Sequence, residues 1–355
     1  MQVQRPGRRA AAAARFAATR AAYGGGAVGG LAALGYGLVR AESALARRAI
    51  GEPTEVPPDP TGTYGRHPGR VLRLVVIGDS GMAGLGCDVP AQTPGALLAG
   101  GLARELKRRV RLASVAVVGA RSADLETQVA QALAEPVDLA VIMIGTNDVT
   151  HRVLPGEAAH DLGKAVRALR AAGAVVVVGT CPDLGTVEPL MQPLRAIARF
   201  YSRKMAAAQL EVVVENGGTA VSLGTLLSPE FAEHPHLWSP DRFHPSPRGY
   251  RRVADALLPA LLQHAHGAVP WPVPVSSSLQ DVAVAAGVAA REPGTTVEPV
   301  EPDDEESTGV PGRLVRLVRR LPLVGRGDPD ELDPEAEEAA VPASGTGDER
   351  HPETP

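Results

Sequence analysis

Short, nearly continuous apolar runs divide the middle of this chain into strand-like segments. The clearest run, 71–77, holds one charged residue and ends at Gly78. Runs of this kind are typical of parallel strands that are covered on both faces. We expect further strands at 112–118, 139–144 and 174–178, and a weaker one at 211–214.

Segments with helical periodicity lie between these runs. The best marked begins at Pro94, because Thr93 is a suitable N-cap and proline is favoured in the first helical turn. The expected helices are 94–109, 122–134, 157–172, 189–209 and 247–263. Alternating strands and helices predict an α/β protein, a three-layer α/β/α sandwich around a five-stranded parallel, flavodoxin-like sheet.

The alternation is confined to the middle of the chain. Residues 71–264, a stretch of about 190 residues, are enough for one buried core and form the predicted domain. Residues 40–70 contain a Pro-, Gly- and Thr-rich part and are interpreted as a linker. Residues 265–355 are rich in proline and acidic residues, so a disordered tail is expected there.

The N-terminal region predicts an attachment to a membrane. Residues 1–20 are basic, whereas 21–39 contain no charged residue and approach the length of a membrane-spanning helix. Many glycines make the segment weakly apolar, and Ala44-Leu-Ala46 resembles a signal-peptide cleavage site. We favour a single-pass anchor over a cleaved signal peptide or a disordered leader. The protein is therefore expected at the cell membrane or secreted, rather than in the cytoplasm.

Composition narrows the function classes. Aromatic residues make up only 3% of the 355 residues, so the core must consist of small aliphatic side chains, which suits helices packed on a sheet. The net charge is −4 and the central region has no basic stripe, so a nucleic-acid partner is not expected. Cys87 and Cys181 lie in no metal-binding spacing, and either one disulfide or two free thiols is consistent with them.

Residues with catalytic potential follow three of the predicted strands. Ligands bind beyond the carboxyl ends of parallel strands, so these positions are expected to share one edge of the sheet. Ser80 lies in Gly78-Asp-Ser-Gly and is a candidate nucleophile, although a turn or a phosphate loop would have the same pattern. Gly119 and Asn147 follow the next two strands and can donate hydrogen bonds to an oxyanion, although each also suits an ordinary turn.

A candidate base lies near the last predicted helix. Asp241 and His244 are separated by two residues, which lets the carboxylate accept a hydrogen bond from Nδ1–H while Nε2 faces a nucleophile. His234 and His236 have no carboxylate at such a spacing. A nucleophile, oxyanion donors and an Asp/His pair in one consistent order favour catalysis over a set of unrelated turns.

Taken together, these motifs resemble the SGNH (GDSL-like) hydrolases of the esterase/lipase type. Gly78-Asp-Ser80 is similar to the nucleophile block of that family and Gly119 to its glycine block. Asn147 corresponds to the asparagine block, and Asp241-Arg-Phe-His244 to the D-x-x-H block. After Ser80 the first block continues with Gly81-Met82, where the family motif has Leu, so the motif does not indicate which ester is the substrate. The resemblance covers about 71–263.

This resemblance implies both a mechanism and a set of roles. Ser80 would form an acyl-enzyme, His244 would be the base and Asp241 would orient it. The oxyanion hole would consist of the N–H groups of Ser80 and Gly119 and the side-chain amide of Asn147. No metal or organic cofactor is implied. The expected activity is hydrolysis of a small-molecule, glycan or lipid carboxylic ester by an esterase, lipase or deacetylase.

The substrate pocket and two rival functions remain open. We expect the pocket to be lined by Met82, Leu85, Val149, Cys181 and Leu184, which suit either an acetyl group or a longer acyl chain. One rival is a catalytically silent flavodoxin-like module that binds carbohydrate or a protein. The other, a phosphate-binding loop after the first strand, lacks the Lys-Ser/Thr ending of a P-loop. We expect a monomer.

Overall fold

Five parallel strands form the centre of the molecule. The computed structural model describes residues 33–51, 55–265, 276–281, 289, 295–299 and 314–319. The parallel strands, in spatial order, are β3 (Val110–Ser114), β2 (Leu72–Gly78), β4 (Leu139–Met143), β5 (Val175–Gly179) and β6 (Thr219–Val221). The predicted α/β fold with a parallel, flavodoxin-like sheet is confirmed.

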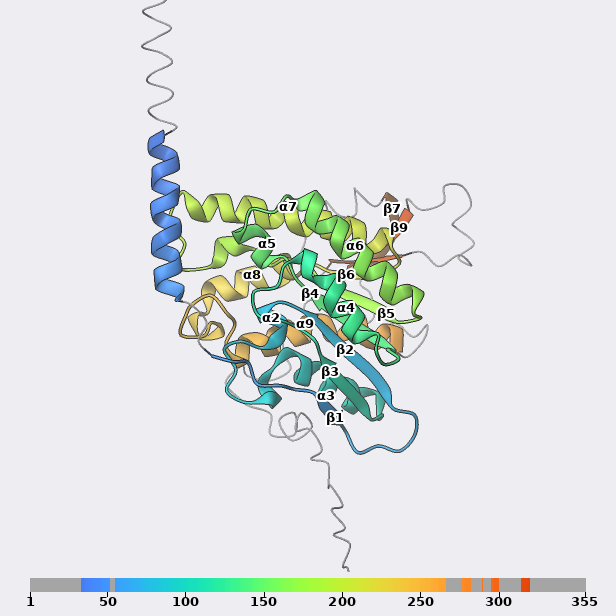
Figure 1. The fold of residues 1–355 in the computed structure, drawn as a ribbon. Helices are drawn as coiled ribbons and strands as arrows, with labels where there is room; N and C mark the ends of the chain where they lie inside the picture. The colour runs from blue at the N-terminus through green and yellow to red at the C-terminus, as the bar shows by residue number, and fades with distance from the viewer. Residues whose placement is uncertain are drawn as a thin grey trace, which may run out of the picture.

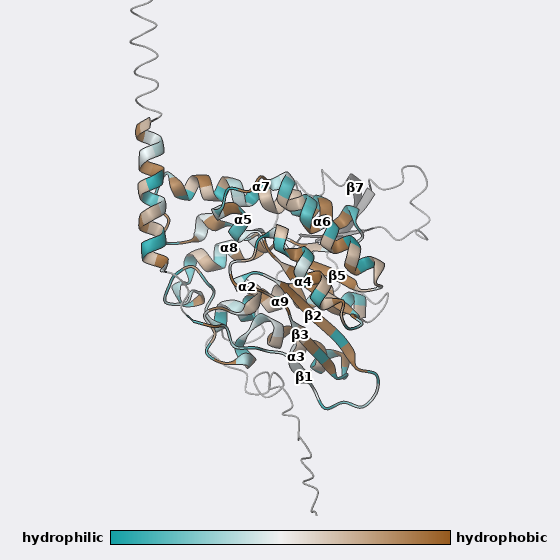
Figure 2. Cartoon of the chain, in the orientation of Figure 1, coloured by the Kyte–Doolittle hydropathy of each residue, from teal (hydrophilic) through white to brown (hydrophobic). Residues whose placement is uncertain are grey.

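Helices cover both faces of this sheet (Figure 1). One layer consists of α4 (Leu125–Ala132), α6 (Pro155–Ala171) and α7 (Leu194–Glu215). The other consists of α3 (Pro94–Leu106) and α9 (Pro247–Ala265). Alternate residues of β2 pack into the two layers: Val75 and Ile77 face the first, whereas Leu74 and Val76 face the second. The central strands are therefore apolar on both faces, and Figure 2 shows them mainly in brown, the colour of hydrophobic residues.

The predicted fifth strand is displaced. Residues 211–214 form part of α7, whose buried positions include Val213 and Val214, and the strand that completes the parallel sheet is β6. The apolar run is explained by helix packing, since Leu210, Val213 and Val214 belong to the core on that side. A strand of three residues is too short for its own pattern to be distinctive.

Additional strands extend the sheet at both edges. The strand β1 (Gly62–Tyr64) pairs antiparallel with β3, and buried Tyr64 donates a hydrogen bond from its hydroxyl to Pro60 O at 2.6 Å. At the other edge β8 (Thr295–Pro299) pairs with β6, followed by β9 (Leu314–Arg319) and β7 (Ser276–Asp281). The sheet therefore includes strands on both sides of the predicted domain, 71–264. The rest of the predicted tail lies outside the described residues.

An N-terminal helix, residues 33–50, packs against the domain. Its buried residues include Glu42 and Ala46. Residues 1–20 and most of 21–39 lie outside the described residues, so the anchor stays a prediction. Among the helices that the structure does describe, none combines the length and the apolar character needed to cross a membrane.

Candidate active site

The backbone before Ser80 is tightly constrained. Gly78 has φ of 148°, and a Cβ at this position would collide with the carbonyl oxygen of Met143 on β4. The side chain of Gln128, buried on α4, binds both polar groups of Gly78: Oε1 accepts from its N–H at 2.8 Å and Nε2 donates to its carbonyl at 3.0 Å. The end of β2 is thereby fixed on two sides.

Ser80 is the first residue of the short helix α2 (Ser80–Ala83). Asp79 caps this helix, because its Oδ1 accepts a hydrogen bond from the N–H of Gly81 at 2.9 Å. Gly84 caps the C-terminus of the helix, and its φ of 84° is favourable for glycine. Ser80 is therefore held in a short, capped helix directly after β2.

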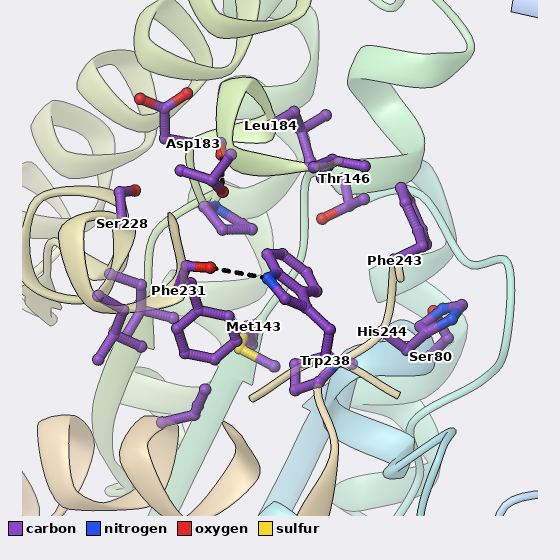
Figure 3. A pocket seen from close by; sticks show the side chains of 18 of the residues that line it. Ser80, Met143, Thr146, Asp183, Leu184, Ser228, Phe231, Trp238, Phe243 and His244 are labelled. Carbon is purple, nitrogen blue, oxygen red and sulfur yellow. Dashed lines mark hydrogen bonds between the residues drawn. The ribbon is translucent and has the colours of Figure 1, made fainter. Parts of the chain in front are cut away.

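The structure brings together the three residues that the sequence suggested as a catalytic group. Ser80 Oγ lies 3.0 Å from His244 Nε2, and His244 Nδ1 lies 2.6 Å from Asp241 Oδ2. Figure 3 shows the Ser80 and His244 side chains next to each other. With a proton on Nδ1, Nε2 can accept the hydroxyl proton of the serine. The arrangement can therefore generate an alkoxide nucleophile.

The carboxylate of Asp241 is held by its own loop. Oδ1 accepts hydrogen bonds from the N–H groups of Phe243 and His244, both at 2.9 Å. Partial burial raises the pKa of Asp241, but the hydrogen bonds from the His244 side chain and from these two N–H groups outweigh it and lower the pKa to about 2. Asp241 is therefore negatively charged throughout the ordinary pH range.

The two predicted oxyanion donors follow the strands on either side of β2. Gly119, with φ of 82°, follows β3, and Asn147 lies in α5 (Thr146–Thr150), which follows β4. Asn147 Nδ2 donates to the carbonyl of Ala120 at 3.0 Å, which joins the two loops. Gly119 and Asn147 are thereby positioned at the same sheet edge as Ser80.

Asp148 provides a second connection between these loops. Its buried carboxylate accepts from the N–H of Ser122 at 3.1 Å and from its hydroxyl at 3.0 Å. Burial raises the pKa of Asp148, although the Ser122 hydrogen bonds act in the opposite direction. Asp148 therefore connects the segments that carry the oxyanion donors, a role that its position in the sequence did not indicate.

Asp79 differs from Asp241 in its surroundings. It is buried next to Ser80, and this desolvation raises its pKa to about 7, against the lowering effects of the Gly81 N–H and the nearby His244. With few hydrogen bonds to its carboxylate, the charged form is poorly compensated. Its protonation state therefore changes near neutral pH.

An apolar cavity of about 100 Å³ opens beside Ser80 and His244 (Figure 3). Aromatic side chains gather around it, and Trp238 donates from Nε1 to the carbonyl of Phe231 at 2.8 Å while the two rings meet edge to face. The other principal lining residues are Met143, Leu184, Val187, Leu223, Leu227 and Phe243. The cavity suits the apolar part of a substrate.

Of the five predicted pocket residues, only Leu184 lines this cavity. Met82 belongs to the core under α3, because the α2 turn points it inward, and Leu85 is likewise buried. Cys181 packs against α7 residues, and Val149 lies between that cluster and the one around Leu184. These four side chains are therefore not part of the lining of this cavity, because closeness to Ser80 or Asn147 in sequence does not determine which layer a side chain enters.

The cavity residues that sequence reasoning missed come mainly from α8 (Leu223–Glu233) and the loop after it. A compositional signal was present, since Phe231, Trp238 and Phe243 fall within thirteen residues of a chain with four Phe and two Trp. In the same region, His234 and His236 are exposed.

No group of His, Cys, Asp and Glu within the described ranges could hold a metal, and both Cys87 and Cys181 are free thiols.

Comparison with known proteins identifies the family. The sequence model of the GDSL-like Lipase/Acylhydrolase family matches residues 76–252, which include all four motifs. A GDSL-like esterase from Mycobacterium tuberculosis (strain ATCC 25618 / H37Rv) is 40% identical over 272 residues, covering 73% of this chain and 85% of that protein. The chain belongs to the GDSL-like lipase/acylhydrolase family. This GDSL-like hydrolase is therefore a serine ester hydrolase, and a catalytically silent module is not favoured.

Two solved structures are also similar to this GDSL-like hydrolase over about half of its length. The crystal structure of TesA is 24% identical, with a TM-score of 0.45, and covers 54% of this chain and 99% of that one. The psychrotrophic esterase EstA from Pseudoalteromonas sp. is 16% identical, with a TM-score of 0.45, and covers 55% of this chain and 99% of that one. Both matches leave nearly half of this chain uncovered.

The raised pKa of Asp79 predicts a pH-dependent stability difference. The folded state keeps a proton on Asp79 up to about pH 7, whereas the unfolded chain loses it near pH 4. Wild-type stability should therefore fall as the pH rises between these values. Asp79→Asn retains an oxygen acceptor for Gly81 but cannot ionise, so its stability relative to wild type should increase by up to a few kcal/mol between pH 4 and pH 8. Urea unfolding at several pH values measures this difference, and a constant difference would contradict the prediction.

Proposed function

We propose that this enzyme cleaves carboxylic esters through an acyl-enzyme formed on Ser80. The observation that carries the proposal is the hydrogen-bonded line from Asp241 Oδ2 through the His244 ring to Ser80 Oγ, with distances of 2.6 and 3.0 Å. Asp241 holds the ring orientation and its negative charge stabilises the imidazolium that forms during the reaction. In this role His244 acts first as a base and then as an acid.

The reaction proceeds in two acyl transfers. Ser80 Oγ attacks the ester carbonyl while its proton moves to His244 Nε2, and the resulting tetrahedral intermediate collapses as that proton passes to the leaving alcohol. Water then attacks the acyl-enzyme, again giving its proton to His244, and the second collapse releases the acid and restores the serine hydroxyl. These steps use only the chain's own side chains and water.

The oxyanion of each tetrahedral intermediate is stabilised from three directions. The N–H of Ser80 stands at the start of α2, where a helix has no internal acceptor for it. Gly119 offers its backbone N–H, and Asn147 has a second Nδ2 hydrogen beside the one given to Ala120. Such fixed donors contribute strongly to acyl transfer because they are already oriented before charge develops.

The size and apolar lining of the cavity favour a short acyl group. An apolar cavity of about 150 Å³ can hold benzene, so the cavity of about 100 Å³ beside Ser80 suits an acyl chain of roughly four carbons. Of the two aspartates among its lining residues, Asp183 forms ion pairs with Arg199 and Arg203, and Asp79 is buried next to Ser80. Trp238 and Phe231 close the apolar side and would limit chain length.

We also propose that residues 21–39 attach the enzyme to the cell membrane, with cleavage and secretion as the alternative. The absence of charged residues in this segment supports the proposal. Retention fits the packing of the helix 33–50, which begins within this segment. Removal of the chain up to Ala46 would delete Glu42, which accepts a hydrogen bond from Leu194 N–H at 2.9 Å.

Substitution of the catalytic groups tests the mechanism. Ser80→Ala should abolish hydrolysis of p-nitrophenyl butyrate by the purified protein. Asn147→Ala should lower kcat by about a hundredfold to a thousandfold, as expected for the loss of one oxyanion donor. Thr150→Ala, a change at an exposed residue of the same helix, is the matched control and should leave kcat near that of wild type. Full activity of Ser80→Ala, or an unchanged kcat for Asn147→Ala, would rule out the assigned role.

A series of acyl lengths tests the cavity. We expect kcat/KM for p-nitrophenyl butyrate to exceed that for the laurate by at least about tenfold. Trp238→Ala should enlarge the cavity and reduce this ratio, while Tyr201→Ala, which removes an exposed aromatic ring on α7, should not. A wild-type preference for laurate would show that the acyl chain binds elsewhere.

Cell fractionation tests the location. The anchor predicts full-length protein in the membrane fraction, resistant to extraction with salt. A soluble exported form that begins near Arg47 would instead support cleavage, and full-length protein in the soluble cytosol would contradict both alternatives.

A further inference from the structure

We propose that the outer face of the N-terminal half of α7 rests on the surface of an anionic lipid bilayer. This α7 outer face is defined by exposed apolar and cationic side chains, namely Ile197, Arg199, Phe200, Tyr201, Arg203 and Lys204. The inference goes beyond ester hydrolysis, because it assigns a partner to a surface outside the catalytic site.

The apolar side chains of this face are unusually exposed for such large groups. Phe200 is 55% exposed, Tyr201 41% and Ile197 39%. The rings of Phe200 and Tyr201 meet edge to face, and the Lys204 ammonium lies 4.8 Å from the centre of the Phe200 ring. Aromatic and aliphatic groups flanked by Lys and Arg are the combination that lets a helix lie in the headgroup region of a bilayer.

The charge of the face has the sign that anionic lipids require. Residues 191–210 contain four basic residues and no acidic one. Arg199 and Arg203 share a single carboxylate, that of Asp183, at 3.6 and 2.9 Å, so positive charge remains in excess. A shallow groove of about 530 Å³ runs along this face between the basic side chains and could receive lipid headgroups.

The N-terminal helix, residues 33–50, connects the predicted membrane segment to the α7 outer face. Glu42 is buried against the start of α7, where its carboxylate accepts a hydrogen bond from Leu194 N–H. The preceding end of the helix projects beyond α7 (Figure 1), and Leu34 and Tyr36 on it are 72% and 62% exposed. The uncharged stretch 21–39 thus ends three residues before the point of attachment to α7. If that stretch enters a bilayer, α7 lies close to the bilayer surface.

A bilayer fits this face better than the acidic C-terminal segment of the same chain. Residues 328–338 carry seven carboxylates and could pair with the cations. They include one large apolar residue, Leu332, and so offer little to cover Phe200, Tyr201 and Ile197. A lipid surface has anionic headgroups next to an apolar interior. The headgroups can pair with the cationic side chains of the face, and the interior can cover the apolar ones.

A fluorescent probe on the face tests the proposal directly. Phe200→Cys in the full chain is labelled with an environment-sensitive NBD dye, since the native thiols Cys87 and Cys181 are buried. Val89→Cys, at an exposed apolar position next to α3, is the matched control. Vesicles of phosphatidylcholine with phosphatidylglycerol should shift the emission to the blue at position 200 and not at position 89. Vesicles of phosphatidylcholine alone should produce a much weaker response.

Charge reversal tests the electrostatic part. In the labelled protein, Lys204→Glu should weaken vesicle binding at this face on the order of tenfold. Arg109→Glu, which reverses an exposed cation on the α3 side, should have little effect. Hydrolysis of p-nitrophenyl butyrate should be unchanged in all these variants, which verifies that each one is folded.

Three results would overturn the proposal. The first is an unchanged spectrum at position 200 with anionic vesicles, even when fractionation places the protein in membranes. The second is an equal response to neutral and anionic vesicles. The third is an NBD emission at position 200 that is already shifted to the blue before vesicles are added, but that is not shifted in a chain ending at Arg319. That result would show that the acidic segment covers the face. Each result is independent of whether Ser80 is the nucleophile.

Discussion

The close contact between the Gly78 backbone and the carbonyl of Met143 sets the position of the nucleophile. No side chain fits at residue 78. Because Gly78 has none, the end of β2 can lie close to the carbonyl of Met143 on β4, directly before the chain turns into α2. Gln128 then holds both polar groups of the Gly78 peptide unit from the helix layer. Because the turn is fixed on these sides, Ser80 begins a helix at a defined place on the sheet edge. The loops that contribute Gly119 and Asn147 leave the strands directly beside it.

Three aspartates around this edge, of which Asp79 and Asp148 are buried and Asp241 is half-buried, differ in how well their charge is compensated. Asp241 accepts from two backbone N–H groups and from His244, and its pKa falls to about 2. The pKa values of Asp79 and Asp148 are raised by burial, which their hydrogen bonds offset only in part. The degree of burial, together with the number and kind of donors, therefore sets the direction in which each pKa moves. Asp241 has the lowest pKa of the three, and it is also the carboxylate that must stabilise a positively charged imidazole.

The sequence predicted the buried central strands and the catalytic residues that follow them. β2, β4 and β5 are covered on both faces, so their apolar runs are distinctive, and the residues that follow them share one edge by topology. Asp241 and His244 were recognisable because their contact is local. The edge strands β1 and β8 and the three-residue β6 gave no comparable pattern. The cavity could not be predicted, because its wall comes from α8, a helix that the periodicity did not reveal, and from side chains whose direction depends on packing.

The Asp241 loop has a consequence for how the enzyme loses function. The base and the carboxylate that orients it are three residues apart and are joined both through side chains and through the loop's own amides, so they move as one body. The contact with Ser80 instead joins segments 164 positions apart in the chain. Moderate warming that loosens the packing of this loop would separate hydroxyl from imidazole while the sheet persists. Inactivation would then precede melting of the fold.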